Sequence, residues 1–139
     1  IHFLEEALTS SYSRVKREKP DNHTNHDLKT DLGAVNMKNW RDIEKLGPFG
    51  LGNGKPAFLF EGVKIEKIKK FGKNGSGEHL EVIFSGSENK KVPAVAFFSG
   101  ADSFGVLLEE ERSVNLLATF DLSRFRGREE LRLRITDIL

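Results

Sequence analysis

The stretch LGPFGLGNGKPAFLF, from Leu46 to Phe60, marks the point where the chain changes from helix-forming to strand-forming sequence. Glycine and proline recur between positions 47 and 56. Glycine adopts positive φ at low cost and proline interrupts regular structure, so this composition predicts an ordered turn. Helical signals precede the turn and strand signals follow it, and the rest of the chain is placed relative to it.

A glycine-rich turn can also be a phosphate-binding loop, but the sequence argues against that interpretation. Lys55 is followed by Pro56 where the nucleotide-binding pattern needs Ser or Thr, and Phe49 stands where the first glycine is required. The direction is also wrong, since such loops run from a strand into a helix N-terminus and this one runs from a helix into a strand. We therefore do not expect phosphate binding of this type.

The composition is that of a folded domain with balanced charge. The 139 residues include 11 Phe and no Cys, with 37% hydrophobic and 31% charged residues and a formal net charge of +1. This length suits one domain, or a domain of about 100 residues with an extension. The lack of cysteine excludes disulfides and thiolate metal sites and agrees with a reducing cytoplasm. No long apolar run or signal peptide is present, so we expect a soluble protein without a membrane partner.

Residues 1–35 are expected to form an N-terminal helix and a polar linker. Apolar residues recur every three or four positions from Ile1 to Val15, which is typical of one helical face, packed either on this domain or within a preceding domain of a longer protein. A start at Ile1 rather than Met suggests a fragment. Residues 16–27 lack apolar side chains, as linkers do. His23 and His26 lie near acidic residues there, but metal ligands need rigid support, so we expect a solvated loop.

Residues 36–57 are expected to form a short helix followed by the turn. Asn36 or Asn39 can cap the helix, and Gly47 with Pro48 supplies the usual stop. Its apolar face comprises Met37, Trp40, Ile43 and Leu46. Trp40 and Phe49 are expected to seat the helix and turn against the following domain, because buried aromatic side chains provide large packing areas.

Residues 58–139 carry five strand candidates and one short helix. The alternation of apolar and polar residues predicts strands at 58–71, 79–84, 92–98, 114–122 and 131–135, with a bend near Gly62 in the first. The helix is expected from Ser99 to Glu111. The resulting order, β-β-β-α-β-β, is that of the OB-fold, a mainly β five-stranded Greek-key barrel.

Positive charge gathers in the two loops that OB-folds use for binding, those joining strands one to two and four to five. Five Lys against two Glu between 58 and 73, and five Arg against two Glu between 124 and 134, each give a local charge of +3. Phe71 and Phe125 lie in the same loops, and aromatic rings beside cations can stack bases while the cations follow phosphates. Alternatively, the charges form a solvated surface and both Phe side chains plug the ends of the barrel.

Several motifs in order resemble a known family: PFGLGN, PAFLFEGVKI, GEHLEVIF, VPAVAF and FRGREELRLRITDI. They are similar to the C-terminal OB domain of RecJ, the bacterial single-stranded-DNA-specific exonuclease, over about Trp40 to Leu139. The chain departs from the family pattern at Gly54, where proline or another residue is usual, and at Phe125, where Trp or Tyr is usual. A glutamine often found near Arg132 is also missing.

The resemblance implies a bacterial, cytoplasmic parent enzyme that degrades single-stranded DNA from the 5′ end, with Mn²⁺ or Mg²⁺ bound by Asp and His residues of a DHH domain. That constellation is missing here, because the histidines at 2, 23, 26 and 79 are scattered. The chain alone is therefore expected to have no catalytic residues and no cofactor. Its expected partners are single-stranded DNA and the catalytic domains of the parent protein.

The resemblance and the charge pattern together indicate which residues contact DNA. The candidates are Lys69, Lys70, Phe71, Lys73, His79, Arg124, Phe125, Arg126, Arg128 and Arg132. Two other functions remain open, since OB barrels also bind proteins, and the turn with the Trp40 helix also suits a structural brace for catalytic domains.

Overall fold

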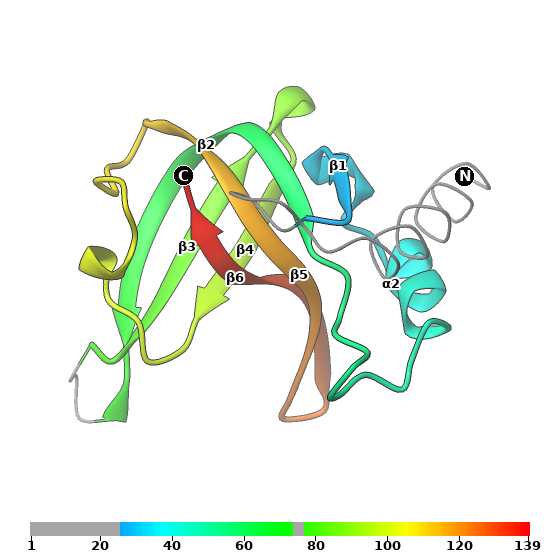
Figure 1. Cartoon of the computed structure of the whole chain (residues 1–139). Helices are drawn as coiled ribbons and strands as arrows, with labels where there is room; N and C mark the ends of the chain where they lie inside the picture. Colours follow the sequence, from blue (N-terminus) through cyan, green and yellow to red (C-terminus); the bar gives the residue numbers. More distant parts are fainter. Residues whose placement is uncertain (1–25, 74–76) are drawn as a thin grey trace.

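The computed structural model describes residues 26–73 and 77–139. A barrel of strands forms the body of the described residues, and a small unit containing helix α2 lies on one side of it (Figure 1). The helix expected between residues 1 and 15, and the linker as far as residue 25, lie outside the described residues.

The barrel confirms the mainly β, five-stranded OB-fold. Its strands are β2 (Phe58–Phe71), β3 (His79–Ser85), β4 (Lys91–Ala96), β5 (Ser113–Phe125) and β6 (Arg128–Ile138). The sheet order is β1-β2-β3-β4-β6-β5, and an additional β2–β5 pairing closes the barrel. The β4–β6 pairing is parallel, whereas β2–β3, β3–β4, β5–β6 and β2–β5 are antiparallel.

The core follows from the alternation of residues along these strands. Leu80, Val82 and Phe84 of β3 are fully buried, while the residues that alternate with them, His79, Glu81 and Ile83, are only partly buried. The rings of Phe58 and Phe120 meet inside the barrel with their centroids 4.9 Å apart. Each large apolar side chain buried in this way contributes about 1.5–3 kcal/mol to folding. The alternate side chains of the same strands point out of the barrel, where they can contact solvent or a ligand.

Strand β2 changes partner along its length, as the expected bend near Gly62 requires. Its first half pairs with β5 and its second half with β3, and the register shifts between Phe60 and Val63 and again between Ile65 and Lys67. Gly62 has φ of +63°, a conformation that glycine adopts without strain. The bulges therefore let one long strand run from the helical side of the molecule to the β2–β3 loop.

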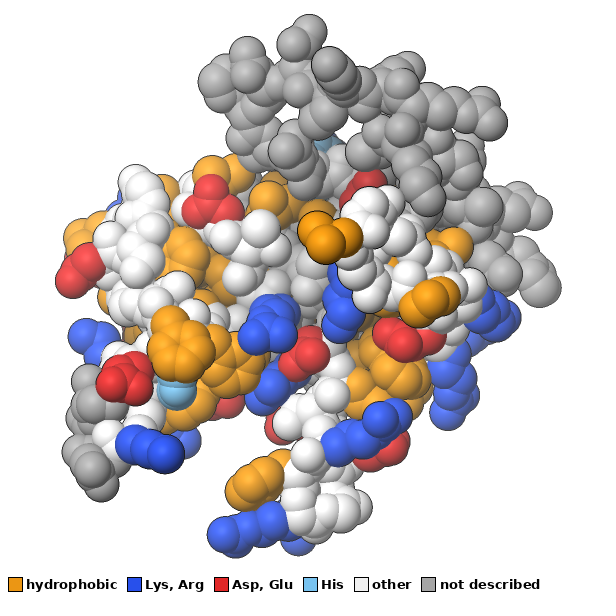
Figure 2. Space-filling model, turned by 60° about the horizontal axis from the view of Figure 1, so that its bottom comes forward, with side chains coloured by type: hydrophobic (Ala, Val, Ile, Leu, Met, Phe, Trp, Pro, Cys, Tyr) orange, Lys and Arg blue, Asp and Glu red, His pale blue; other side chains and the backbone are white. Residues whose placement is uncertain are grey.

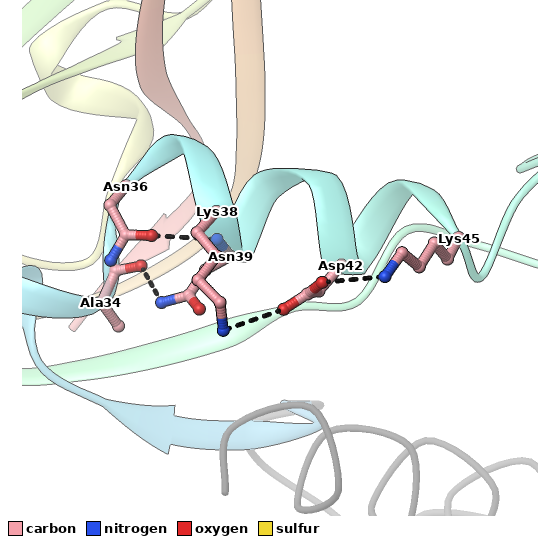
Figure 3. A network of polar contacts seen from close by, with 6 residues as sticks. All are labelled: Ala34, Asn36, Lys38, Asn39, Asp42 and Lys45. Carbon is pink, nitrogen blue, oxygen red and sulfur yellow. Dashed lines mark hydrogen bonds and ion pairs between the residues drawn. The ribbon is translucent and has the colours of Figure 1, made fainter. Parts of the chain in front are cut away.

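The unit beside the barrel is built by short-range hydrogen bonds. Helix α2 (Met37–Glu44) begins after Asn36, whose Oδ1 accepts the Asn39 N–H at 2.9 Å, and the Asn39 side chain donates to the Ala34 carbonyl at 2.8 Å (Figure 3). Trp40 and Phe49 are partly buried against the core, as expected. In the turn that follows, the Asn53 side chain donates to the Pro48 carbonyl at 2.7 Å, so the turn is ordered.

Residues 28–30, which the sequence analysis included in the N-terminal segment 1–35, form strand β1 (Leu28–Thr30). It pairs in parallel with Phe58–Phe60 at the start of β2. Short 3₁₀ turns complete the chain, at η1 (Leu32–Ala34), η3 (Ser87–Asn89) and η4 (Ala101–Ser103). Among the described helices, none is long and apolar enough to cross a membrane.

Three predictions differ from the structure. The fourth and fifth strands, expected at 114–122 and 131–135, extend to Phe125 and begin at Arg128, so a two-residue turn stands where a loop was expected. The helix expected from Ser99 to Glu111 is only the 3₁₀ turn η4 followed by irregular chain. Gly100, Ser103 and Gly105 have low helix propensity, and the apolar residues there are too closely spaced to outweigh it. The third strand also stops at Ala96 rather than at Phe98, because Phe98 has φ of +54°, which a strand does not accommodate.

Candidate nucleic-acid interface

The strand register places most candidate residues on the outer face of the barrel. Residues opposite each other in a ladder share a face, and alternate residues along a strand share it too. Phe71 pairs with His79, Val95 pairs with Arg134, and Phe125 pairs with Arg128. Successive residues of this face therefore follow one another across β2, β3, β4, β6 and β5. The members are Lys69, Phe71, His79, Glu81, Val95, Phe97, Arg134, Arg132, Asp121, Phe125 and Arg128.

Aromatic rings from three strand ends form one cluster on this face, which we call the ring cluster and define as Phe71, His79, Phe97 and Phe98. The centroid of His79 lies 5.2 Å from that of Phe71, 5.3 Å from that of Phe97 and 4.8 Å from that of Phe98. The Phe98 N–H also donates to His79 Nδ1 at 3.1 Å. His79 is thus the centre of the cluster, and Phe98 is its most exposed member, at 84%.

Two arginines of β6 extend the ring cluster toward β5. The guanidinium groups of Arg132 and Arg134 lie 5.6 and 4.8 Å from the centroid of the Phe97 ring, within the range of cation–π contact. Arg132 Nε also donates to Asp121 at 2.8 Å in a pair whose side chains are mostly buried. In the described part of the chain, no carboxylate forms an ion pair with Arg134. Arg134 therefore has more freedom to meet an anion than Arg132.

The second group of candidates lies at the end of the β5–β6 hairpin. Its turn consists of Arg126 and Gly127, with φ of +51° and +74°, as in the two-residue turns that match the twist of a hairpin. Phe125 is 68% exposed, and the Arg126 guanidinium lies 5.2 Å from its ring centroid. Arg124 Nε donates to Glu129 at 3.2 Å. We call this segment, residues 123–130, the hairpin tip.

The ring cluster and the hairpin tip project from the same end of the barrel without lying side by side. The β2–β3 loop and the β5–β6 hairpin are two arms in Figure 1, and Figure 2 shows a hollow between them. Apolar side chains are exposed on both arms, and basic side chains gather between them (Figure 2). The arrangement is therefore a groove open to solvent, with aromatic surface on either side.

The lysines of β2 are divided by their partners. Lys64 contacts Glu66 and Glu111 at 3.3 and 3.1 Å, and hydrogen bonds to these carboxylates raise the pKa of Lys64. The hydrogen bond from the Ser85 hydroxyl, together with Lys64, lowers the pKa of Glu66. The charge of Lys64 is thus balanced by two carboxylates. The positive charge available to a ligand therefore lies at and just beyond the end of the strand, on Lys69, Lys70 and Lys73.

The structure distributes the predicted residues as follows. Lys69, Phe71, His79, Phe125, Arg128 and Arg132 belong to the outer face, whereas Lys70 and Arg124 alternate to the opposite side of their strands. Arg126 occupies the turn, and Lys73 lies in the β2–β3 loop, next to residues outside the described ranges.

Phe97, Phe98 and Arg134 were missed by the sequence analysis. Both Phe residues follow an apolar run, so the sequence analysis included them in the predicted strand, which ends before Ser99 and Gly100. Arg134 was counted as charge but not as a site residue. Its alternation with Arg132 along the fifth strand was the available signal.

The described residues do not fit a metal ion. No group of three or more His, Cys, Asp or Glu side chains within them could hold one. His79 Nδ1 accepts a backbone N–H instead, and His26 and Asp27 lie by β1, on the helical side of the barrel. No chemistry of the Mn²⁺ or Mg²⁺ expected for a parent enzyme is therefore assigned to these residues.

Comparison with known proteins shows that the chain matches a family model and that its fold is similar to solved structures. A family model described as the RecJ OB domain matches residues 26–137. The crystal structure of RecJ from Thermus thermophilus in complex with Mg²⁺ superposes with a TM-score of 0.59 and 19% identity, covering 91% of this chain and 18% of that one. The Mn²⁺ complex of RecJ from the same organism gives a TM-score of 0.55 and 21% identity, covering 79% and 14%. No curated protein matches the chain in sequence. The chain thus spans less than a fifth of the RecJ structures that it resembles.

Proposed function

The chain belongs to the RecJ OB domain family, and from this premise we propose that it binds single-stranded DNA in the groove between the ring cluster and the hairpin tip. In this proposal it is the DNA-gripping part of a bacterial, cytoplasmic 5′-to-3′ exonuclease and guides the strand toward a catalytic DHH domain. Hydrolysis and the Mn²⁺ or Mg²⁺ that supports it belong to that domain. The partners of the chain are then single-stranded DNA and the catalytic domains.

The observation that carries the proposal is the meeting of exposed rings and cations on one outer face. OB-folds bind oligonucleotides with the face of their second and third strands and the loops joining strands one to two and four to five. In this chain the corresponding parts are β3 and β4, the β2–β3 loop and the β5–β6 hairpin, and they carry His79, Phe97 and Phe125.

The two kinds of side chain suit two parts of the ligand. Exposed aromatic rings stack on unpaired bases, with little preference for sequence because every base has a π-face. Basic side chains neutralise phosphates and release counterions, so they supply affinity that depends on salt. Paired bases in a duplex are already stacked on one another and offer no free face to the rings, which favours a single strand.

Fluorescence anisotropy with a labelled oligothymidine tests the proposal on the intact 139-residue chain. We expect binding that weakens as salt rises and a lower affinity for the matching duplex. The same samples incubated with Mn²⁺ or Mg²⁺ should release no nucleotides from a 5′-labelled oligonucleotide. An absence of salt-dependent binding would instead support a protein-docking module or a structural brace.

A further inference from the structure

Phe98 combines two features that are costly for an aromatic residue. Its side chain is 84% exposed, so it contributes little to the core. Its backbone has φ of +54°, a left-handed conformation in which a bulky side chain is uncommon. Such conformations persist only where the surrounding structure holds them, and they concentrate at functional sites.

His79 is what holds Phe98 in place. The Phe98 N–H donates to His79 Nδ1 at 3.1 Å, and the two rings meet nearly perpendicular, at 80° and 4.8 Å. His79 is itself fixed by Phe71 and Phe97, whose centroids lie 5.2 and 5.3 Å away. Because Nδ1 accepts a hydrogen bond, the proton of the neutral imidazole is on Nε2.

We propose that Phe98 is the platform on which one unpaired base stacks, and that His79 is the positioning residue that orients it. The proposal rests on the function given above and adds to it the place of a base. An edge-to-face contact with one neighbour leaves most of the Phe98 ring open, as its exposure requires.

A phosphate partner lies close to this platform. Phe97 precedes Phe98 in the chain, and the Arg134 guanidinium lies 4.8 Å from its ring centroid. Arg132 is nearby but donates to Asp121, whereas Arg134 has no carboxylate partner among the described residues. Arg134 is therefore the residue of this face that we expect to meet the phosphate next to a base on Phe98.

The first test compares substitutions of Phe98 by anisotropy with oligothymidine. Phe98→Ala and Phe98→Leu should each weaken binding by about 5- to 150-fold, because one stacked base is lost, and Phe98→Tyr should bind like the unmodified chain. The slope of log Kd against log salt should be the same in all of them, since stacking releases no counterions. Leu107→Ala is the matched control, because Leu107 is also exposed in the segment between β4 and β5 but does not belong to the ring cluster.

The second test asks whether His79 acts through Phe98. His79→Asn places an amide oxygen near the position of Nδ1 and should largely retain binding, whereas His79→Leu removes the acceptor and should weaken it like Phe98→Ala. Combining His79→Leu with Phe98→Ala should weaken binding no further, because coupled residues are not additive. Thermal denaturation of each variant reports whether the fold is intact.

The outcomes separate the two proposals. If Phe98→Ala binds as tightly as the unmodified chain and both retain the same salt dependence, the platform is overturned and the proposed function stands. Equal effects of His79→Asn and His79→Leu in folded proteins would overturn the positioning role. If the unmodified chain does not bind oligothymidine, both the proposed function and the platform are overturned.

Discussion

The ring cluster and the hairpin tip face the same groove but are built in different ways. Each ring of the cluster touches at least one other ring, and a hydrogen bond joins His79 to the Phe98 backbone. Every residue from Arg124 to Glu130 is exposed, and the hairpin tip is held by its own ladder and its turn. The rings of one arm are therefore packed on each other before any ligand arrives, whereas the other arm presents its charge on solvent-exposed side chains.

This difference between the arms leads us to expect two separate contributions to binding, base stacking from one arm and phosphate neutralisation from the other. Ordering a long charged side chain on binding costs about 0.5–1.5 kcal/mol, which the packed rings of the cluster largely avoid. We therefore expect the ring cluster to determine where a base sits, and the hairpin tip to determine how strongly affinity depends on salt.

Removing the ring that joins the cluster to the two arginines should have the largest effect. Phe97 contacts Phe71, His79 and the guanidinium groups of two arginines. Phe97→Ala should weaken oligothymidine binding by about 10- to 100-fold, comparable to the loss of one or more stacked bases, as measured by anisotropy.

A matched control separates this effect from general destabilisation. Phe49 is also a partly buried aromatic residue, but it packs on the helical side of the molecule. Phe49→Ala should lower the melting temperature without changing the affinity of the folded protein. Unchanged DNA binding by Phe97→Ala would contradict the view that the ring cluster fixes the ligand.

Removing charge from the other arm should change the salt dependence rather than the geometry. The log-log salt slope for single strands is about 0.7 per neutralised phosphate, so Arg126→Ala with Arg128→Ala should lower it by roughly 1 to 1.5. Lys38→Ala with Lys45→Ala removes the same charge from α2 and its C-cap and should leave the slope unchanged. An identical slope in the double arginine variant would move the site away from the hairpin tip.

The turn of the hairpin gives a smaller, purely conformational prediction. Gly127 has φ of +74° with open space where a Cβ would lie, so Gly127→Ala introduces backbone strain without a clash. Unfolding free energy should fall by about 1 kcal/mol, as measured by urea denaturation. Gly50→Ala, also in open space but without positive φ, should be neutral by comparison. Equal stability of the two variants would contradict the role of the turn.

The smallest effect concerns two ion pairs between β5 and β6, one beside the ring cluster and one in the hairpin tip. Asp121 and Arg132 are 17% and 21% exposed, whereas Glu129 and Arg124 are 54% and 68% exposed. Double-mutant cycles on stability should give a coupling near 1 kcal/mol for the first pair and about 0–0.5 kcal/mol for the second, because solvent screens exposed pairs. The reverse order would mean that the hairpin tip is the more rigid arm.

The fold could be predicted from sequence because its signals are local. Alternation gave the strands of the barrel, and Asn36 and Gly47 marked the ends of the helical segment. The failures were local as well. Between Ser99 and Glu111, glycine and serine prevented the helix that the apolar residues favoured, and a positive φ at Phe98 ended the third strand two residues early.

The ring cluster could not be predicted in the same way, because it depends on registers between distant strands. Phe71 and His79 were candidates through charge and resemblance, but their contact with Phe97 requires β4 to pair with β3 in one particular register. Nothing near Phe97 in the sequence records that register. Arg134 joins the cluster only through the parallel pairing of β6 with β4.

The short strand β1 has a mechanical consequence. It runs parallel to the start of β2, with Leu28 opposite Phe58 and Thr30 opposite Phe60, and the Asp27 N–H bonds the Ala57 carbonyl just before them. A pull on the chain ahead of Leu28 acts along β1, while the rest of β2 resists in the opposite direction. These bonds are then loaded together in shear rather than broken one after another. Tension from that side therefore loads the start of β2, at the opposite end of that strand from Phe71 and the ring cluster.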